Sequence, residues 1–128
     1  MNYYFNKTLT ADFESVKNRV VEELAKEGFG VLSEIDMQKA FKKKLHVDFR
    51  KYLILGACNP HFAHKAINAE DKIGTMLPCN VILQEVSDGV VEVAAINATA
   101  SMQAVKNSKV SDIAKQISEK LKKVIAAL

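Results

Sequence analysis

The sequence has few cysteines and no long apolar run, and these absences exclude two broad classes of protein. Two cysteines do not make the disulfide framework of a small secreted protein, so we expect reduced thiols. No window approaches the roughly 18 consecutive apolar residues of a membrane span. The first residues, MNYYFNKTLTADFESV, lack the basic and apolar regions of a secretion signal. The sequence therefore predicts a soluble cytoplasmic protein with no membrane partner.

Phosphate-binding loops and basic stripes are also missing. The five glycines do not form a G-x-G-x-x-G or G-K-[ST] pattern, so nucleotide binding has no support. Eighteen Lys and Arg against fifteen Asp and Glu leave a net charge of only +3. No aromatic residues interleave with the lysine run at 42–44, as they would in a surface that stacks bases. We therefore expect no nucleic-acid partner.

The composition is that of an ordinary globular protein. The chain has 128 residues, of which 48% are apolar and 26% are charged, close to the averages for folded domains. At this length folding buries about two-thirds of the surface of the unfolded chain, so neither disulfides nor a structural metal are needed for stability. We expect one domain spanning residues 1–128.

The spacing of apolar residues predicts the element order βαβαβαββα. Strands are expected at 3–9, 29–35, 52–57, 81–86 and 90–96, and helices from Thr10 to Gly28, at 37–45, after Asn59-Pro60 and from Ser108. Asp36 is expected to cap the second helix, residues 71–78 read as a loop, and a short turn of helix is expected within 98–105. Ser87-Asp88-Gly89 predicts a hairpin between the last two strands. The pattern indicates an α+β fold, with helices packed against a mixed or mainly antiparallel sheet.

Two short segments contain the residues with the most chemical potential. Cys58-Asn59-Pro60 follows an apolar strand, and Pro78-Cys79-Asn80 leads into the next strand. Each Cys therefore adjoins an Asn and a Pro at the boundary of an element. Cys58 would lie just outside the N-terminus of a helix, where the dipole favours a thiolate over a thiol. If the two strands are neighbours, both sulfurs face the same end of the sheet.

Several interpretations of this cluster stay open. Cys58, His61, His64 and Cys79 could ligate zinc or copper(I), although their spacing departs from the paired knuckles of structural zinc sites. Cys58 could instead be a nucleophile or redox thiol with His61 or His64 as its base. A third interpretation is a non-catalytic pocket for an anion or a small polar molecule at the helix start after Asn59. Against all three, a Cys at the end of an apolar strand commonly packs as a small hydrophobe.

Nearly the whole chain resembles the family catalogued as domain of unknown function 302. The similar segments include EGFGVL at 27–32, EID at 34–36, ILGACNP at 54–60, AHKA at 63–66 and LPCNV at 77–81. The resemblance implies a small α+β domain and a homodimer as its assembly, and it assigns no activity or cofactor. His61 lies outside the family pattern and His64 inside it. The suspected site carried over is Cys58, Asn59, Pro60, His64, Pro78, Cys79 and Asn80.

The leading hypothesis is that Cys58, His64 and Cys79 gather at one end of the sheet. There they would bind a small molecule or metal, or present a reactive thiol. The alternative is a structural or interaction module with buried, inert cysteines, assembled as a homodimer. Neither a reaction nor a cofactor follows from the residues.

Overall fold

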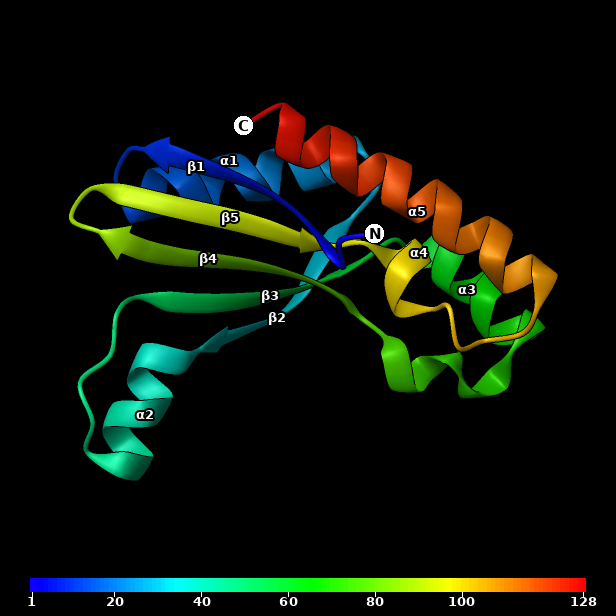
Figure 1. Cartoon of the computed structure of the whole chain (residues 1–128), viewed down its shortest axis with the longest axis horizontal. Helices are drawn as coiled ribbons and strands as arrows, with labels where there is room; N and C mark the ends of the chain where they lie inside the picture. Colours follow the sequence, from blue (N-terminus) through cyan, green and yellow to red (C-terminus); the bar gives the residue numbers. More distant parts are fainter.

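In the computed structural model, which describes residues 1–128, helices pack on a five-stranded sheet (Figure 1). The strands are β1 (Tyr4–Thr10), β2 (Gly30–Asp36), β3 (Tyr52–Cys58), β4 (Cys79–Ser87) and β5 (Val90–Ile96). The helices are α1 (Phe13–Lys26), α2 (Met37–Leu45), α3 (Pro60–Ala69), α4 (Ala98–Ser101) and α5 (Ser108–Ala126), with a 3-10 helix η1 (Asp71–Met76). The predicted α+β fold and order of main elements are confirmed.

The strands lie in the order β1-β5-β4-β3-β2, and every neighbouring pair is antiparallel. The sheet is therefore antiparallel throughout, without the parallel pairs that a mixed sheet would contain. Because β3 lies beside β4, the end of one strand meets the start of the other, and Ala57 is paired with Cys79. This pairing brings the two cysteine segments to the same end of the sheet.

The core lies between one face of the sheet and helices α1 and α5, which pack above it in Figure 1. Alternate strand residues point into this layer, as the period of two requires. The buried strand side chains on this face are Leu53, Leu55, Ala57, Cys79, Val81, Leu83, Val91, Val93 and Ala95. The opposite face of these strands carries half-buried and exposed side chains. No helix is long and apolar enough to cross a lipid bilayer.

The helix starts agree with the capping residues expected from the sequence, except that Asp12 and not Thr10 caps the first helix. Helix α1 begins after Asp12, whose carboxylate accepts a hydrogen bond from the backbone N–H of Ser15 at 3.0 Å. Thr10, the expected cap, is instead the last residue of β1. A carboxylate two residues nearer the helix both accepts this bond and complements the dipole. Asp36 caps α2 as predicted and accepts from the N–H of Lys39 at 3.0 Å.

Three further features, η1, the β4–β5 hairpin and the placement of α2, complete the fold. Residues 71–76, predicted as loop, form the 3-10 helix η1, whose Ile73 is buried and anchors the segment to the core. The predicted hairpin joins β4 to β5, with Gly89 at φ +73°, a conformation that glycine adopts without steric cost. Helix α2 extends away from the body of the sheet in Figure 1 and buries none of its residues fully.

Candidate functional site

A hollow of about 350 Å³ opens at the end of the sheet where β3 stops and β4 starts, and we call it the cysteine hollow. Both cysteines line it, and both are unpaired. Cys58 is half-buried, whereas Cys79 is only 5% exposed. The full lining is Phe29, Leu32, Ala57, Cys58, Asn59, Ala63, Ile67, Gly74, Leu77, Pro78, Cys79 and Ile117. The wall is therefore mainly hydrocarbon, with two sulfurs and one amide.

Of the seven suspected site residues, the fold brings four together and leaves three outside. Cys58, Asn59, Pro78 and Cys79 line the cysteine hollow. The other three, which do not line it, are Pro60, His64 and Asn80. Asn80 follows Cys79 on the same strand, and consecutive strand residues point to opposite faces. Its side chain is exposed on the face of the sheet away from the helices.

The histidines are not assembled with the cysteines. His61 and His64 are both exposed on α3, and Nε2 of His64 lies 3.3 Å from Nδ2 of Asn68, one turn further along the helix. No three His, Cys, Asp or Glu side chains anywhere in the chain are grouped so that they could hold a metal ion. The expected metal cluster of Cys58, His61, His64 and Cys79 is therefore not formed. Both histidines lie on the polar face of α3, and neither lines the cysteine hollow.

Burial raises the pKa of the Cys79 thiol to about 11, and the nearby Cys58 adds to the rise because two thiolates repel each other. Cys79 is therefore protonated at neutral pH. A protonated, buried thiol is a poor nucleophile and a poor metal ligand. If a sulfur of this hollow reacts, it is that of Cys58.

Asn59 stands at the N-cap position of α3, but its side chain forms its hydrogen bond elsewhere. It is the residue before the first turn of α3, but its side chain accepts no hydrogen bond from that helix. Its amide Nδ2 instead donates to the backbone carbonyl of Glu27 at 3.2 Å. Gly28 follows at φ +86°, and a Cβ there would lie 3.0 Å from the same amide. Asn59 therefore ties the start of α3 to the end of α1 and fixes one wall of the hollow.

The opposite rim of the hollow depends on a close approach between Gly56 and Pro78. The Leu77–Pro78 peptide bond is cis. A Cβ on Gly56 would lie 2.8 Å from Cγ of Pro78 and would collide with Oγ of Ser33. Only glycine leaves room for the proline ring and the serine side chain on this face of β3. The glycine thus sets where the β4 segment carrying Pro78 and Cys79 lies.

The apolar wall of the hollow was not identified from the sequence. Phe29, Ala63 and Ile117 come from the residue before β2, from α3 and from α5. In the sequence these residues have the same periodic spacing as ordinary core residues. No local signal distinguishes an apolar side chain that lines an opening from one that fills the core.

The carboxylates Glu34 and Asp36 are both occupied by structural contacts. Oε1 of Glu34 lies 2.6 Å from Nζ of Lys17, and this hydrogen-bonded partner raises the pKa of Lys17. Asp36 caps α2. The pair therefore joins β2 to α1 and α2.

Comparisons with known proteins agree with this architecture. The family model described as "Domain of unknown function DUF302" matches residues 5–128. The crystal structure of an uncharacterized conserved protein DUF302 from Bacillus stearothermophilus superposes with a TM-score of 0.89. The two chains are 23% identical, and the superposition covers 98% of each. At this identity the likeness supports the fold alone. A search of curated proteins found no match.

Proposed function

Since this chain belongs to the DUF302 family of domains of unknown function, whose name assigns no activity, we infer its function from the site itself. We propose that it binds a small, mainly apolar molecule in the cysteine hollow. The observation that carries this proposal is that Cys58 and Cys79 line one open hollow of about 350 Å³ with a hydrocarbon wall. Small-molecule pockets commonly have this character, with few polar groups and a volume of roughly 300 to 1,000 Å³.

The chemistry of the lining defines the class of ligand. The polar groups that line the hollow are the two cysteine sulfurs and the side chain of Asn59. The Asn59 amide already donates to Glu27, and burial keeps the Cys79 thiol protonated, with a pKa of about 11. No charged side chain lines the hollow, so a neutral or weakly polar molecule is favoured over a highly charged one.

Binding can be tested with the neutral fluorescent probe N-phenyl-1-naphthylamine and a variant that fills the hollow. Ala63→Leu adds hydrocarbon to a lining position on α3, and Ala126→Leu adds the same group at an exposed position near the end of α5. We expect saturable binding by the natural chain and by Ala126→Leu, weakened roughly fivefold or more in Ala63→Leu. Thermal unfolding of each variant checks that it is folded.

A second readout uses Cys58 itself. Because Cys58 lines the hollow and is half-buried, a bound probe should slow its alkylation by iodoacetamide. Probe binding that leaves both the alkylation rate and the Ala63→Leu affinity unchanged would place the ligand elsewhere and refute the proposal.

A reactive thiol is the second candidate function, and the half-exposed position of Cys58 next to the N-terminus of α3 favours it. The test compares the alkylation rate of Cys58 in the folded Cys79→Ala variant with its rate in urea. A rate higher in the folded protein supports an activated thiol. A rate much lower in the folded protein supports the alternative, a structural or interaction module with inert cysteines.

We also propose that two copies associate through β2 and α2. β2 is an edge strand. Exposed apolar side chains lie on it, at the last residue of α2 and just after that helix: Ile35 (49% exposed), Leu45 (62%) and Val47 (48%). Exposed apolar groups on an unpaired edge favour pairing with a second copy, and a two-fold axis would let the same surface meet itself. We expect sedimentation to report a dimer for the natural chain. The double variant Leu45→Lys and Val47→Lys should dissociate this dimer into monomers. A monomeric natural chain would refute this.

The unpaired thiols suit a reducing compartment, so the proposed location is the cytoplasm.

A further inference from the structure

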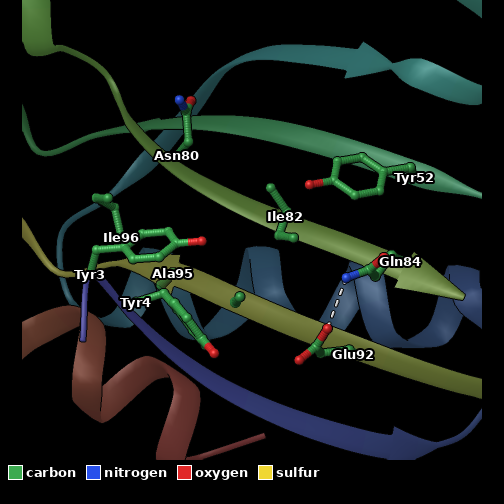
Figure 2. Close-up of a pocket in the computed structure, with 10 residues that line it drawn as sticks. Tyr3, Tyr4, Tyr52, Asn80, Ile82, Gln84, Glu92, Ala95 and Ile96 are labelled. Atoms are coloured by element: carbon green, nitrogen blue, oxygen red, sulfur yellow. Dashed lines mark hydrogen bonds between the residues drawn. The ribbon is translucent and has the colours of Figure 1, made fainter. Parts of the chain in front are cut away.

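The face of the sheet away from α1 and α5 has a second hollow, unrelated to the cysteines. Its volume is about 380 Å³. It is lined by Tyr3, Tyr4, Tyr52, Asn80, Ile82, Gln84, Glu92, Ala94, Ala95 and Ile96 (Figure 2). We call it the tyrosine hollow, because all three tyrosines of the chain line it. They come from the residue before β1, from β1 and from β3, so only the strand order brings them together.

The tyrosine rings and the apolar residues give the hollow its shape. Tyr3 and Tyr4 form an edge-to-face pair with ring centroids 4.9 Å apart. Figure 2 shows these two rings on one side of Ile82 and the ring of Tyr52 on the other. Tyr3 is 67% exposed and therefore forms a rim. The half-buried Ile82 supplies hydrocarbon between the rings, and the half-buried Ile96 supplies it beside Tyr3.

The only charged side chain in the lining is the half-buried Glu92. Its two carboxylate oxygens are held in place by amides, since Oε1 accepts from Nε2 of Gln84 at 2.8 Å and Oε2 accepts from Nδ2 of Asn6 at 2.9 Å. The hollow is thus negative in a chain whose net charge is +3. A fixed carboxylate beside aromatic rings is complementary to an organic cation.

One positive group approaches the hollow without lining it. The guanidinium of Arg50 donates from Nε to Oε1 of Gln84 at 2.8 Å and stacks on Phe49, with 4.4 Å between Cζ and the ring centroid. This contact holds Arg50 at the margin and orients the Gln84 amide so that its nitrogen faces Glu92. Cζ of Arg50 also lies 5.7 Å from the ring centroid of Tyr52, so Arg50 supports the position of the carboxylate and covers Tyr52 at the margin of the hollow.

We propose that the tyrosine hollow binds a small organic ammonium ion, with the rings of Tyr3 and Tyr4 facing its alkyl groups and Glu92 balancing its charge. Aromatic surfaces attract alkylammonium groups through the ring quadrupole, and the attraction grows as water is excluded. The volume of about 380 Å³ admits a compact cation of this kind. This ligand class is distinct from the neutral apolar molecule proposed for the cysteine hollow, so the two proposals can fail separately.

The chain carries its own reporter for this site. It contains no tryptophan and three tyrosines, so its intrinsic fluorescence comes from side chains that all line the hollow. The experiment titrates the protein with choline chloride and, separately, with the neutral isostere 3,3-dimethyl-1-butanol, at constant ionic strength maintained with sodium chloride. We expect a saturable fluorescence change with choline, in roughly the millimolar range, and at least about tenfold weaker binding of the uncharged isostere.

Two variants test the residues directly. Glu92→Gln keeps the size of the side chain and removes its charge, and it should weaken choline binding roughly fivefold or more. Tyr3→Leu removes an exposed rim ring with little effect on folding, and it should weaken binding roughly twofold to fivefold. Lys72→Leu, outside the hollow on η1, is the control and should leave the affinity unchanged. Circular dichroism checks that each variant is folded.

The proposal is overturned by equal affinity for choline and its neutral isostere, or by unchanged affinity in Glu92→Gln and Tyr3→Leu. The absence of any saturable change also overturns it.

Discussion

The side-chain amide of Asn59 donates a hydrogen bond to the backbone carbonyl of Glu27 at 3.2 Å, joining the start of α3 to the end of α1. Asn59 is 9% exposed, so water does not easily replace this bond. Because one residue fixes the relative position of two helices, the shape of the cysteine hollow depends on it.

Asn59→Ala should lower the free energy of unfolding by about 1 to 2 kcal/mol, because the Glu27 carbonyl loses its donor in a poorly hydrated place. Urea denaturation measures the loss. Asn68→Ala on the same helix is exposed and should change stability by less than about 0.5 kcal/mol. Equal effects of the two substitutions would contradict the assigned role.

Gly56→Ala should destabilise the fold by about 1 to 3 kcal/mol. The added methyl group would meet Oγ of Ser33 and Cγ of Pro78, the latter at 2.8 Å, so the rim of the cysteine hollow must shift. Gly30→Ala on the neighbouring strand is the matched control, since a Cβ there has nothing within 4 Å. Thermal or urea unfolding should separate the two variants clearly, and similar stabilities would show that the rim yields without cost.

Stability should fall at high pH because of Cys79. Burial raises its pKa from 9.0 to about 11, so between these values the folded protein keeps a proton that the unfolded chain has lost. The unfolded state is therefore favoured as pH rises through this window, by at most about 3 kcal/mol for two pK units. Unfolding free energies at pH 8 and pH 11 should differ less in Cys79→Ala than in Cys58→Ala. Parallel pH profiles of the two variants would contradict the assignment.

The two thiols should differ in their rates of modification. At pH 8 iodoacetamide should alkylate Cys58 at least about tenfold faster than Cys79, because Cys58 is half-buried whereas Cys79 is buried with a pKa of about 11. Mass spectrometry of the cysteine peptides gives both rates. In urea the difference should disappear, which controls for the local sequence. A native Cys79 that reacts as fast as Cys58 would mean that the hollow opens to solvent.

Part of the candidate site could have been placed more accurately from the sequence. Cys79 and Asn80 come directly before the strand predicted at 81–86, and extending that strand back to them with its period of two puts them on opposite faces. Likewise, the polar face of α3 already separated His64 from the apolar residues that face the core. The shared hollow of Cys58 and Cys79 was different, because it required β3 and β4 to be neighbours.

The sequence alone determined where the elements lie, because helices and strands follow from apolar spacing and from caps such as Asp36, which are properties of a few consecutive residues. The strand order β1-β5-β4-β3-β2 and the uncovered face were decided by pairing between segments far apart in the chain. Tyr3 and Tyr52 line opposite sides of one hollow only because that order places β1 and β3 in the same sheet. Short-range sequence patterns thus determined the helices and strands, whereas contacts between segments distant in sequence created both hollows.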